Sequence, residues 1–182
     1  IHVCESAQAV RDTNLSGAAQ RLHLPLDAAM QPSGLKRLEQ LVRGYRRKNR
    51  GFARYIDKWA AFWRKELRAG RRVTKAVPME LHALRIGNVT FVGLAAEVMA
   101  QYGDWIREAV GPWTVVAGYT DGDMGYLPTT EALAQGGYEA NFHLFENVSA
   151  PFASRIQEFV VRSAKGLARR LELAPCSLPE RR

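Results

Sequence analysis

The sequence contains little cysteine and no long apolar run. Cys4 and Cys176 are its only cysteines in 182 residues, too few for a disulfide-rich scaffold or for a zinc site built from cysteines. They lie near opposite ends of the chain, where a disulfide is conceivable, but two separate thiols are the favoured interpretation. No stretch approaches the roughly 18 to 20 apolar residues that a membrane-spanning helix needs. The composition, 47% apolar and 24% charged, is typical of a folded domain with an apolar core.

Several motifs that identify enzymes are also missing. The sequence has no His-Glu-x-x-His, Cys-x-x-Cys or Gly-x-Ser-x-Gly and no glycine-rich phosphate loop. The histidines, His2, His23, His82 and His143, show no metal-ligand spacing, although His143 lies among phenylalanines and is a minor site candidate. The N-terminus lacks an initiator methionine, a basic region and an apolar region. We therefore recognise no signal peptide and expect a processed or truncated chain.

Positive charge is concentrated in one segment. The chain carries 26 Lys/Arg and 18 Asp/Glu, but residues 34–75 alone hold 15 of the former and 3 of the latter. Helical spacing there predicts a basic helical hairpin with helices over about 34–48 and 51–69, begun by Ser33 and ended by Gly70. The expected inward side chains are Leu35, Leu38, Leu41, Val42 and Tyr45, then Phe52, Tyr55, Ile56, Trp59, Phe62, Trp63 and Leu67. An anionic membrane surface is a candidate partner of the outer cations. Nucleic acid is disfavoured, because the aromatic residues follow the core stripe.

The remaining periodicity predicts an α/β fold. Strands are expected at 21–26, 79–86, 89–96 and 113–117, and helices at 97–110, 130–135 and 149–172, the last begun by Ser149 or Pro151. Pro25 places the first strand at a sheet edge, and the apolar strands 89–96 and 113–117 are expected to be buried. We predict a mixed β-sheet flanked by helices, with the hairpin near the N-terminus, as part of a larger domain. The expected divisions are 1–76, 77–172 and a tail at 173–182.

The most informative segment is the loop and short helix over residues 118–140. It contains Tyr126, Tyr138 and five glycines, which allow backbone conformations that aim side chains into a cleft. Glu97 ends an apolar strand and the loop follows the next strand, so the two are expected to be neighbours at the carboxyl edge of the sheet. Taken singly, Glu97 also fits an acid in the first turn of a helix, and each tyrosine fits a packed aromatic residue. The Asp121-Gly-Asp123 step favours a turn over a cation site.

The segment from Val77 to about Leu171 resembles the C-terminal part of the N-terminal catalytic domain of neutral/alkaline ceramidases. The family shows an apolar strand that ends in an acid, here Val92-Gly-Leu-Ala-Ala-Glu97, and a strand that enters a Gly-Tyr turn, here Ala117-Gly-Tyr-Thr-Asp121. A Gly-Tyr-x-x-Thr step follows, here Gly125-Tyr-Leu-Pro-Thr-Thr130, and then a Tyr-Glu, here Tyr138-Glu139. The match covers about half of this chain.

The resemblance implies a zinc-dependent amidase that cleaves a ceramide-like lipid amide. Glu97 and Tyr126 match two of the family's four zinc ligands, and Tyr138 matches the tyrosine that contacts the substrate amide. Zinc would lower the pKa of a bound water, and a tyrosine would steady the developing oxyanion. The resemblance also implies a secreted, periplasmic or membrane-associated protein.

The sequence departs from the family at several points. The two histidine ligands and the catalytic Gly-Asp-x-Ser segment of the family lie upstream of the matched region and have no counterpart here. Ala95-Ala96 replaces the usual Pro-Gly or Gly-Gly, and Asp121 and Asp123 replace an Asn and an aromatic residue. The missing histidines are expected from an upstream part of the same polypeptide or from a partner chain. The alternatives are a ceramidase-like domain that has lost its chemistry and serves as a binding or scaffold domain, and a basic module that binds nucleic acid or anionic membranes.

Overall fold

The computed structural model describes residues 14–173. Cys4 and Cys176, and the predicted tail beyond residue 173, lie outside the described residues. The elements in chain order are β1 (Leu15–Pro25), η1 (Ala28–Met30), α2 (Leu35–Lys48), η2 (Arg50–Phe52), α3 (Ala53–Arg68), β2 (Ala76–Ile86), β3 (Val89–Leu94), β4 (Glu97–Val98), α4 (Gln101–Val110), β5 (Thr114–Ala117), β6 (Tyr126–Leu127), α5 (Thr130–Gln135), η3 (Glu139–Asn141), α6 (Phe142–Phe145) and α7 (Ile156–Leu173).

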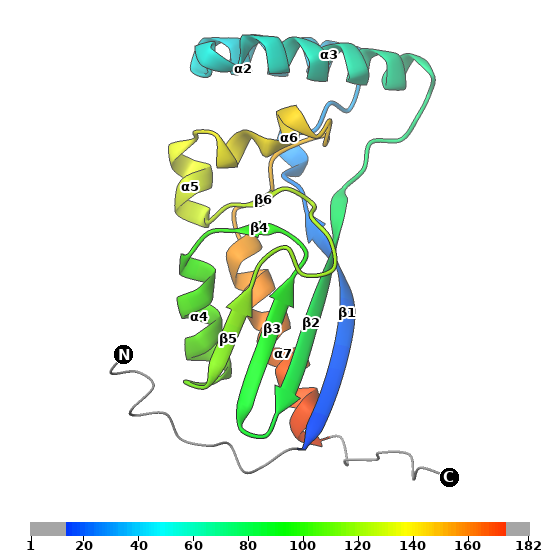
Figure 1. The fold of residues 1–182 in the computed structure, drawn as a ribbon. Coiled ribbons are helices and arrows are strands. Elements are labelled where there is room, and N and C mark those ends of the chain that lie inside the picture. Colours follow the sequence, from blue (N-terminus) through cyan, green and yellow to red (C-terminus); the bar gives the residue numbers. More distant parts are fainter. Residues whose placement is uncertain (1–13, 174–182) are drawn as a thin grey trace.

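A four-stranded mixed sheet forms the centre of the molecule, in the order β1-β2-β3-β5 (Figure 1). Strands β1, β2 and β3 are antiparallel neighbours, and β5 runs parallel to β3. The antiparallel β2–β3 connection turns at Gly87, whose φ of 58° suits glycine. Helix α4 provides the crossover that a parallel pair requires. The α/β class with a mixed sheet flanked by helices is thus confirmed, as is the edge position of β1, although β1 is longer than the predicted strand 21–26.

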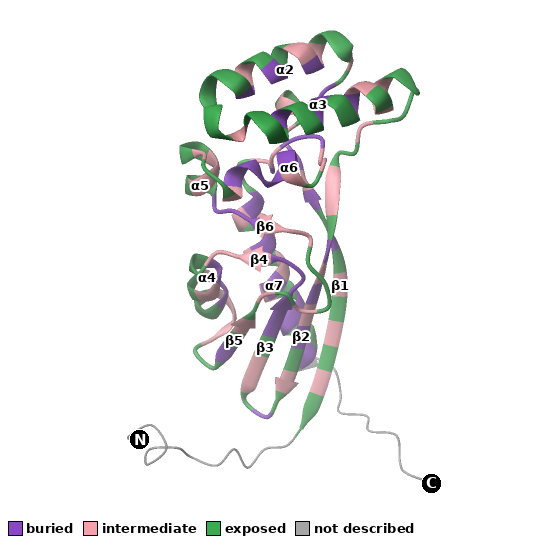
Figure 2. Cartoon of the chain, turned by 45° about the horizontal axis from the view of Figure 1, so that its top comes forward, coloured by how far each residue is buried: buried purple, intermediate pink, exposed green. Residues whose placement is uncertain are grey.

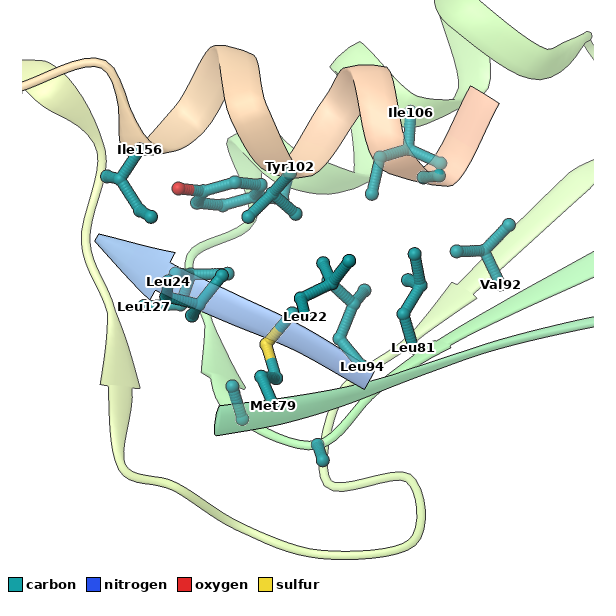
Figure 3. Close-up of a cluster of buried hydrophobic side chains, with 14 of the residues drawn as sticks. Leu22, Leu24, Met79, Leu81, Val92, Leu94, Tyr102, Ile106, Leu127 and Ile156 are labelled. Carbon is teal, nitrogen blue, oxygen red and sulfur yellow. The ribbon is translucent and has the colours of Figure 1, made fainter. Parts of the chain in front are cut away.

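One face of this sheet carries the main core. Side chains at alternate positions of β1, β2 and β3 point toward α4 and α7, as Leu22, Leu81 and Leu94 do in Figure 3. Tyr102 and Ile106 of α4 are also fully buried in this cluster (Figure 3). The alternation of strand side chains places their intervening neighbours on the opposite face.

That opposite face is partly uncovered, which corrects two sequence-based expectations. Strand β5 is an edge strand and not a buried one, with Trp113 66% and Val115 46% exposed. Strand β3 is buried on both faces only in its second half, because Phe91 is exposed beside Leu84 of β2. Both strands are apolar on an open surface, so their composition suggested more burial than the helices provide.

The basic hairpin forms as predicted and has its own apolar cluster. Leu38, Tyr45, Ile56 and Trp59 are buried between α2 and α3, which lie over α6 in Figure 1. Buried and exposed positions alternate along both helices in Figure 2. Three predicted inward side chains, Leu35, Tyr55 and Phe62, are instead exposed. They lie at the margins of stripes wider than the contact between two helices, so they remain on the surface.

The starts of α4 and α7 differ from the predictions, and Ser33 is not the N-cap of α2. Helix α2 begins after Gly34, which has no side chain that could form a cap hydrogen bond. Helix α7 begins at Ile156 and not near residue 150, because residues 151–153 run extended beside the end of β1: the Ala153 amide donates to the Pro25 carbonyl at 2.9 Å. Residue 97 is likewise not in a helix, since α4 begins at Gln101. Within residues 14–173, no helix is long and apolar enough to span a bilayer.

Candidate functional site

The site begins with a second, two-stranded sheet. Strand β4 pairs in parallel with β6, and Glu97 lies directly opposite Tyr126 in the register. Both strands lie beyond the carboxyl ends of β3 and β5, at one edge of the main sheet (Figure 1). Glu97 therefore lies in an extended segment beyond β3 and not in the first turn of a helix, and the structure brings together the two residues matched to zinc ligands.

The loop after β5 is held against this edge by backbone hydrogen bonds. The amides of Tyr119 and Thr120 donate to the carbonyls of Ala96 and Leu94, each at 3.0 Å. The Glu97 amide in turn donates to the Gly125 carbonyl at 3.0 Å. Each bond joins the loop to the end of β3, so the loop and Glu97 form one hydrogen-bonded unit.

Two features fix the path of the loop. Tyr119 and Asp121 have positive φ values of 54° and 58°, a backbone conformation that costs free energy in residues other than glycine. Gly93 is required by close packing, because a Cβ there would lie 2.5 Å from the Thr120 side chain. Asp123 accepts a hydrogen bond from the Gly125 amide at 2.8 Å and forms the expected turn.

A hollow of about 300 Å³ opens between β4, β6 and the loop. Glu97, Tyr119, Tyr126 and Glu139 contribute polar side chains to its lining. A hydrogen-bonding interaction with the Glu97 carboxylate, then partial burial, raises the pKa of Tyr119 to about 12. The same two causes in the same order raise the pKa of Tyr126. Within the described chain, neither hydroxyl joins Glu97 in a hydrogen bond that meets both the distance and the angle expected of one. One carboxylate thus faces two phenols and raises the pKa of both.

Tyr138 lies beside this hollow in a row of aromatic side chains. Its ring meets that of Tyr126 edge-on, with the ring centroids 5.4 Å apart. On its other side it stacks on Phe145 at 4.8 Å, and Phe145 contacts Tyr55 of α3 at 4.6 Å. Tyr138 is 50% exposed and Tyr55 41% exposed. The row therefore runs over the surface from the Glu97 hollow to the basic hairpin.

The described residues supply only part of a zinc coordination sphere. Tyr126 and Glu97 offer two oxygen donors in one hollow, whereas a zinc site needs three or four protein ligands. No cluster of three or more His, Cys, Asp or Glu side chains with metal-binding geometry occurs among residues 14–173. His82 of β2 has its Nε2 3.4 Å from Oδ2 of Asp121. His143 of α6 is buried beneath the hairpin. The donor chemistry fits zinc only if further ligands come from outside the described residues.

Part of this chain is similar to solved ceramidase structures. No protein-family model and no curated protein matches the sequence. Among solved structures, the chain is similar to a neutral ceramidase from Pseudomonas aeruginosa, with 22% identity and a TM-score of 0.42 over 58% of this chain and 17% of that one. It is also similar to a ceramidase complexed with C2, with 23% identity and a TM-score of 0.41 over 58% of this chain and 16% of that one.

Both structures are ceramidases, the family that the sequence resembles, and each matches only part of this chain. The chain spans about a sixth of the length of either ceramidase. At this identity, similarity in fold does not establish activity. The case for a function therefore depends on the residues of the site.

Sequence reasoning missed two members of the site, Tyr119 and Glu139. Tyr119 follows Gly118 in the quoted turn, but its direction depends on its own positive φ, which the sequence does not reveal. Glu139 follows Tyr138 directly, and the short helix η3 turns it toward the hollow. Phe145, the central ring of the aromatic row, was not predicted as part of the site.

Proposed function

We propose that this chain is part of a zinc-dependent amide hydrolase that cleaves the N-acyl bond of a ceramide-like lipid to a fatty acid and an amine. The observation that carries the proposal is the convergence of the Glu97 carboxylate and the hydroxyls of Tyr119 and Tyr126 on one hollow beside Tyr138. Acidic and phenolic oxygens gathered at the carboxyl edge of an α/β sheet are typical of a catalytic or ligand site.

In this proposal Glu97 and Tyr126 are two of the zinc ligands. Histidines from an upstream part of the same polypeptide or from a partner chain complete the set. Zinc supplies a water of lowered pKa when bound. Tyr126 would lose its proton on binding, because a divalent cation outweighs the carboxylate that now raises its pKa.

Tyr138 is the proposed catalytic side chain of the described segment. Its hydroxyl would donate a hydrogen bond to the amide oxygen as negative charge develops there. In the overall reaction the amide C–N bond breaks, the acyl carbon takes the oxygen of water, and the amine takes a proton. Its contacts with Tyr126 and Phe145 hold the ring between the hollow and the aromatic row.

The aromatic row suggests how a lipid amide would lie. Tyr138, Phe145, Phe52 and Tyr55 form a continuous series of ring contacts that leads away from the hollow. An acyl chain placed along these rings would bury apolar surface on both partners. This arrangement favours a long-chain substrate over a small soluble amide.

The deciding experiment is the zinc content of the full gene product as its source makes it, beside the Glu97→Ala variant. We expect about one zinc per chain in the parent and little in the variant. Glu131→Ala, which removes an exposed carboxylate from α5, is the matched control and should keep its zinc. No zinc in the parent protein would overturn the hydrolase proposal.

Activity on a ceramide-like amide then separates the enzyme from a binding domain. We expect Tyr138→Phe to lower kcat by about 100-fold with zinc content unchanged, since loss of one oxyanion donor has an effect of this size. A zinc-containing protein that binds the lipid but releases no fatty acid would instead support the degenerate binding or scaffold alternative.

The outer face of the hairpin favours a second role, attachment to an anionic membrane surface. Helix α3 exposes Tyr55 and Phe62, with the exposed Lys58 between them in sequence. Cations near an anionic surface contribute roughly 1 kcal/mol each, and exposed aromatic rings favour the interface. Vesicles with anionic lipid should bind the parent more tightly than Lys58→Gln/Phe62→Ser. Equal binding to neutral vesicles, or stronger binding to nucleic acid, would reject this role.

A further inference from the structure

The turn that leads into Tyr138 consists of two glycines with positive φ. Gly136 and Gly137 have φ values of 78° and 110°, a region that glycine adopts readily and other residues rarely. A pair of glycines gives the chain many accessible conformations, so the turn itself does not fix the direction in which Tyr138 leaves it. That direction depends on contacts that hold the turn from outside.

The ring contacts of Tyr138 are too weak to provide this hold alone. The residue is 50% exposed. Its ring centroid lies 5.4 Å from that of Tyr126 and 4.8 Å from that of Phe145. A single aromatic pair contributes only modestly to stability. The position of the ring therefore depends mainly on where the backbone places it.

The backbone on both sides of Tyr138 is held by one buried residue, Asn141. Its side chain is 5% exposed, and Nδ2 donates a hydrogen bond to the Gly137 carbonyl. Its backbone amide donates to the Tyr138 carbonyl at 3.1 Å. These two carbonyls belong to the peptide groups before and after the Tyr138 Cα. Because each peptide group is planar, holding both of them fixes φ and ψ of Tyr138 and the direction of its side chain.

The other end of the Asn141 amide contacts the basic hairpin. Oδ1 accepts a hydrogen bond from Nδ2 of Asn49, in the connection between α2 and α3, at 3.3 Å. The Gly137 carbonyl can only accept, so the amino end of Asn141 must face it and the oxygen must face Asn49. Phe52 lies in the same connection, and its ring centroid is 6.4 Å from that of Tyr138. The hairpin therefore meets the Tyr138 turn at two points.

We propose that Asn141 is a positioning residue of the candidate site, which holds Tyr138 against Tyr126 and Phe145 and joins this position to the hairpin through Asn49. Its effect on catalysis rests on the proposed function, in which Tyr138 donates to the amide oxygen. A donor that is already in place at the moment of reaction needs no reorganisation, and small misplacements are costly. The positional part of the inference needs neither zinc nor a reaction.

Fluorine NMR of the full protein labelled with fluorotyrosine tests the position of Tyr138 directly. The resonance that disappears in Tyr138→Phe identifies this residue. In the parent we expect it to lie away from the position of an exposed tyrosine, because the ring stacks on Phe145. Asn141→Asp keeps the shape of the side chain but sets a carboxylate against the Gly137 carbonyl, and the resonance should move to the exposed position. An unchanged resonance in folded Asn141→Asp would overturn the inference.

Two further variants separate this contact from general loosening. Asn49→Ala removes only the hairpin side of the contact and should move the resonance in the same direction by less, which also tests the inference if Asn141→Asp does not fold. Ser149→Ala removes another fully buried polar side chain, which donates to the Thr74 carbonyl at 2.8 Å, and should leave the resonance in place. An equal shift in Ser149→Ala would reject the role of Asn141, and no shift in Asn49→Ala would refute the link to the hairpin.

Kinetics on a ceramide-like amide test the part that rests on the proposed function. Asn141→Asp should lower kcat about tenfold with KM and zinc content nearly unchanged, because the misplaced donor acts in the transition state. Asn141→Asp/Tyr138→Phe should be no slower than Tyr138→Phe, and a much slower double variant would overturn the claim that Asn141 acts through Tyr138. A displaced resonance with unchanged kcat would support Asn141 as the positioning residue and reject Tyr138 as the catalytic group.

Discussion

The molecule contains two apolar clusters, and each buries a tyrosine in a different way. In the sheet cluster, between the β-sheet and helices α4 and α7, the Tyr102 hydroxyl donates to the Pro128 carbonyl at 3.0 Å. In the hairpin cluster, between α2, α3 and α6, the Tyr45 hydroxyl has no partner in the described chain. The hydroxyl of the first cluster is satisfied within the fold, and the hydroxyl of the second is buried without a partner.

The two clusters also differ in how they are connected. The sheet cluster is built from strands far apart in sequence, and the hairpin cluster from two adjacent helices and Leu144 of α6. The indole of Trp59 donates to the Val148 carbonyl at 2.6 Å and ties the hairpin to the rest. The hairpin cluster is therefore local in sequence but joined to the rest of the fold, and both clusters are expected to contribute to stability.

Truncation of Trp59 should have the largest effect. Trp59→Ala removes a fully buried indole and its hydrogen bond, and we expect a loss of about 3–5 kcal/mol in the free energy of unfolding. Chemical denaturation measures it, with the exposed Phe62→Ala of the same helix as the control. A loss below about 1 kcal/mol would mean that the hairpin does not contribute to the cooperative core.

Acid should weaken the hairpin cluster through His143. Its pKa falls from a usual 6.5 to about 3 in the folded protein because of burial, so the unfolded chain binds the proton more readily. The stabilising contribution is complete above about pH 6.5 and is lost as the pH falls toward 3, by roughly 2 kcal/mol at pH 5.

The measurement is the free energy of unfolding against pH for the parent and His143→Gln. The difference between the two curves should change with a slope of about 1.4 kcal/mol per pH unit below pH 6.5. The exposed His23→Gln serves as the control. Parallel curves for the parent and His143→Gln would show that His143 is not buried in the neutral form.

Tyr102→Phe should cost less. The substitution leaves the buried Pro128 carbonyl without its donor, and we expect about 1–2 kcal/mol of destabilisation. Thermal or chemical unfolding at neutral pH measures the effect. A neutral result would contradict the view that the sheet cluster depends on satisfied polar groups.

Tyr45→Phe should have the smallest effect on the free protein. The hydroxyl makes no hydrogen bond in the described structure, so its removal should change the free energy of unfolding by no more than about 0.5 kcal/mol. Measured beside Tyr102→Phe, this variant gives a matched comparison of the two clusters. Destabilisation as large as that of Tyr102→Phe would show that the Tyr45 hydroxyl has a partner within the fold.

Much of the fold could be predicted from periodicity, but the extent of burial could not. The spacing of Leu38, Tyr45 and Ile56 identified the hairpin, and alternation identified β2. Burial of β5 was predicted wrongly, because an apolar strand at an uncovered edge has the same composition as a central one. The start of α7 depended on pairing with β1, a contact that local sequence does not reveal.

The candidate site was predictable in part. Glu97 and Tyr126 were expected to be neighbours because each follows the end of a strand, and the β4–β6 pairing places them side by side. Their roles toward zinc stay predictions. Tyr119 and Glu139 escaped notice, because backbone conformations set at single residues bring them to the hollow.

The pairing of β1 with β2 has a consequence for how this protein can change. Pro25 and Ala76 are partners at the end of the pairing, about 5 Å apart across an antiparallel ladder, so residues 26–75 leave the sheet and return to it at nearly the same point. The hairpin is topologically an insertion in a long β-ribbon. A short turn could replace it without altering a single strand pair, and the protein would lose most of its positive charge in one genetic event.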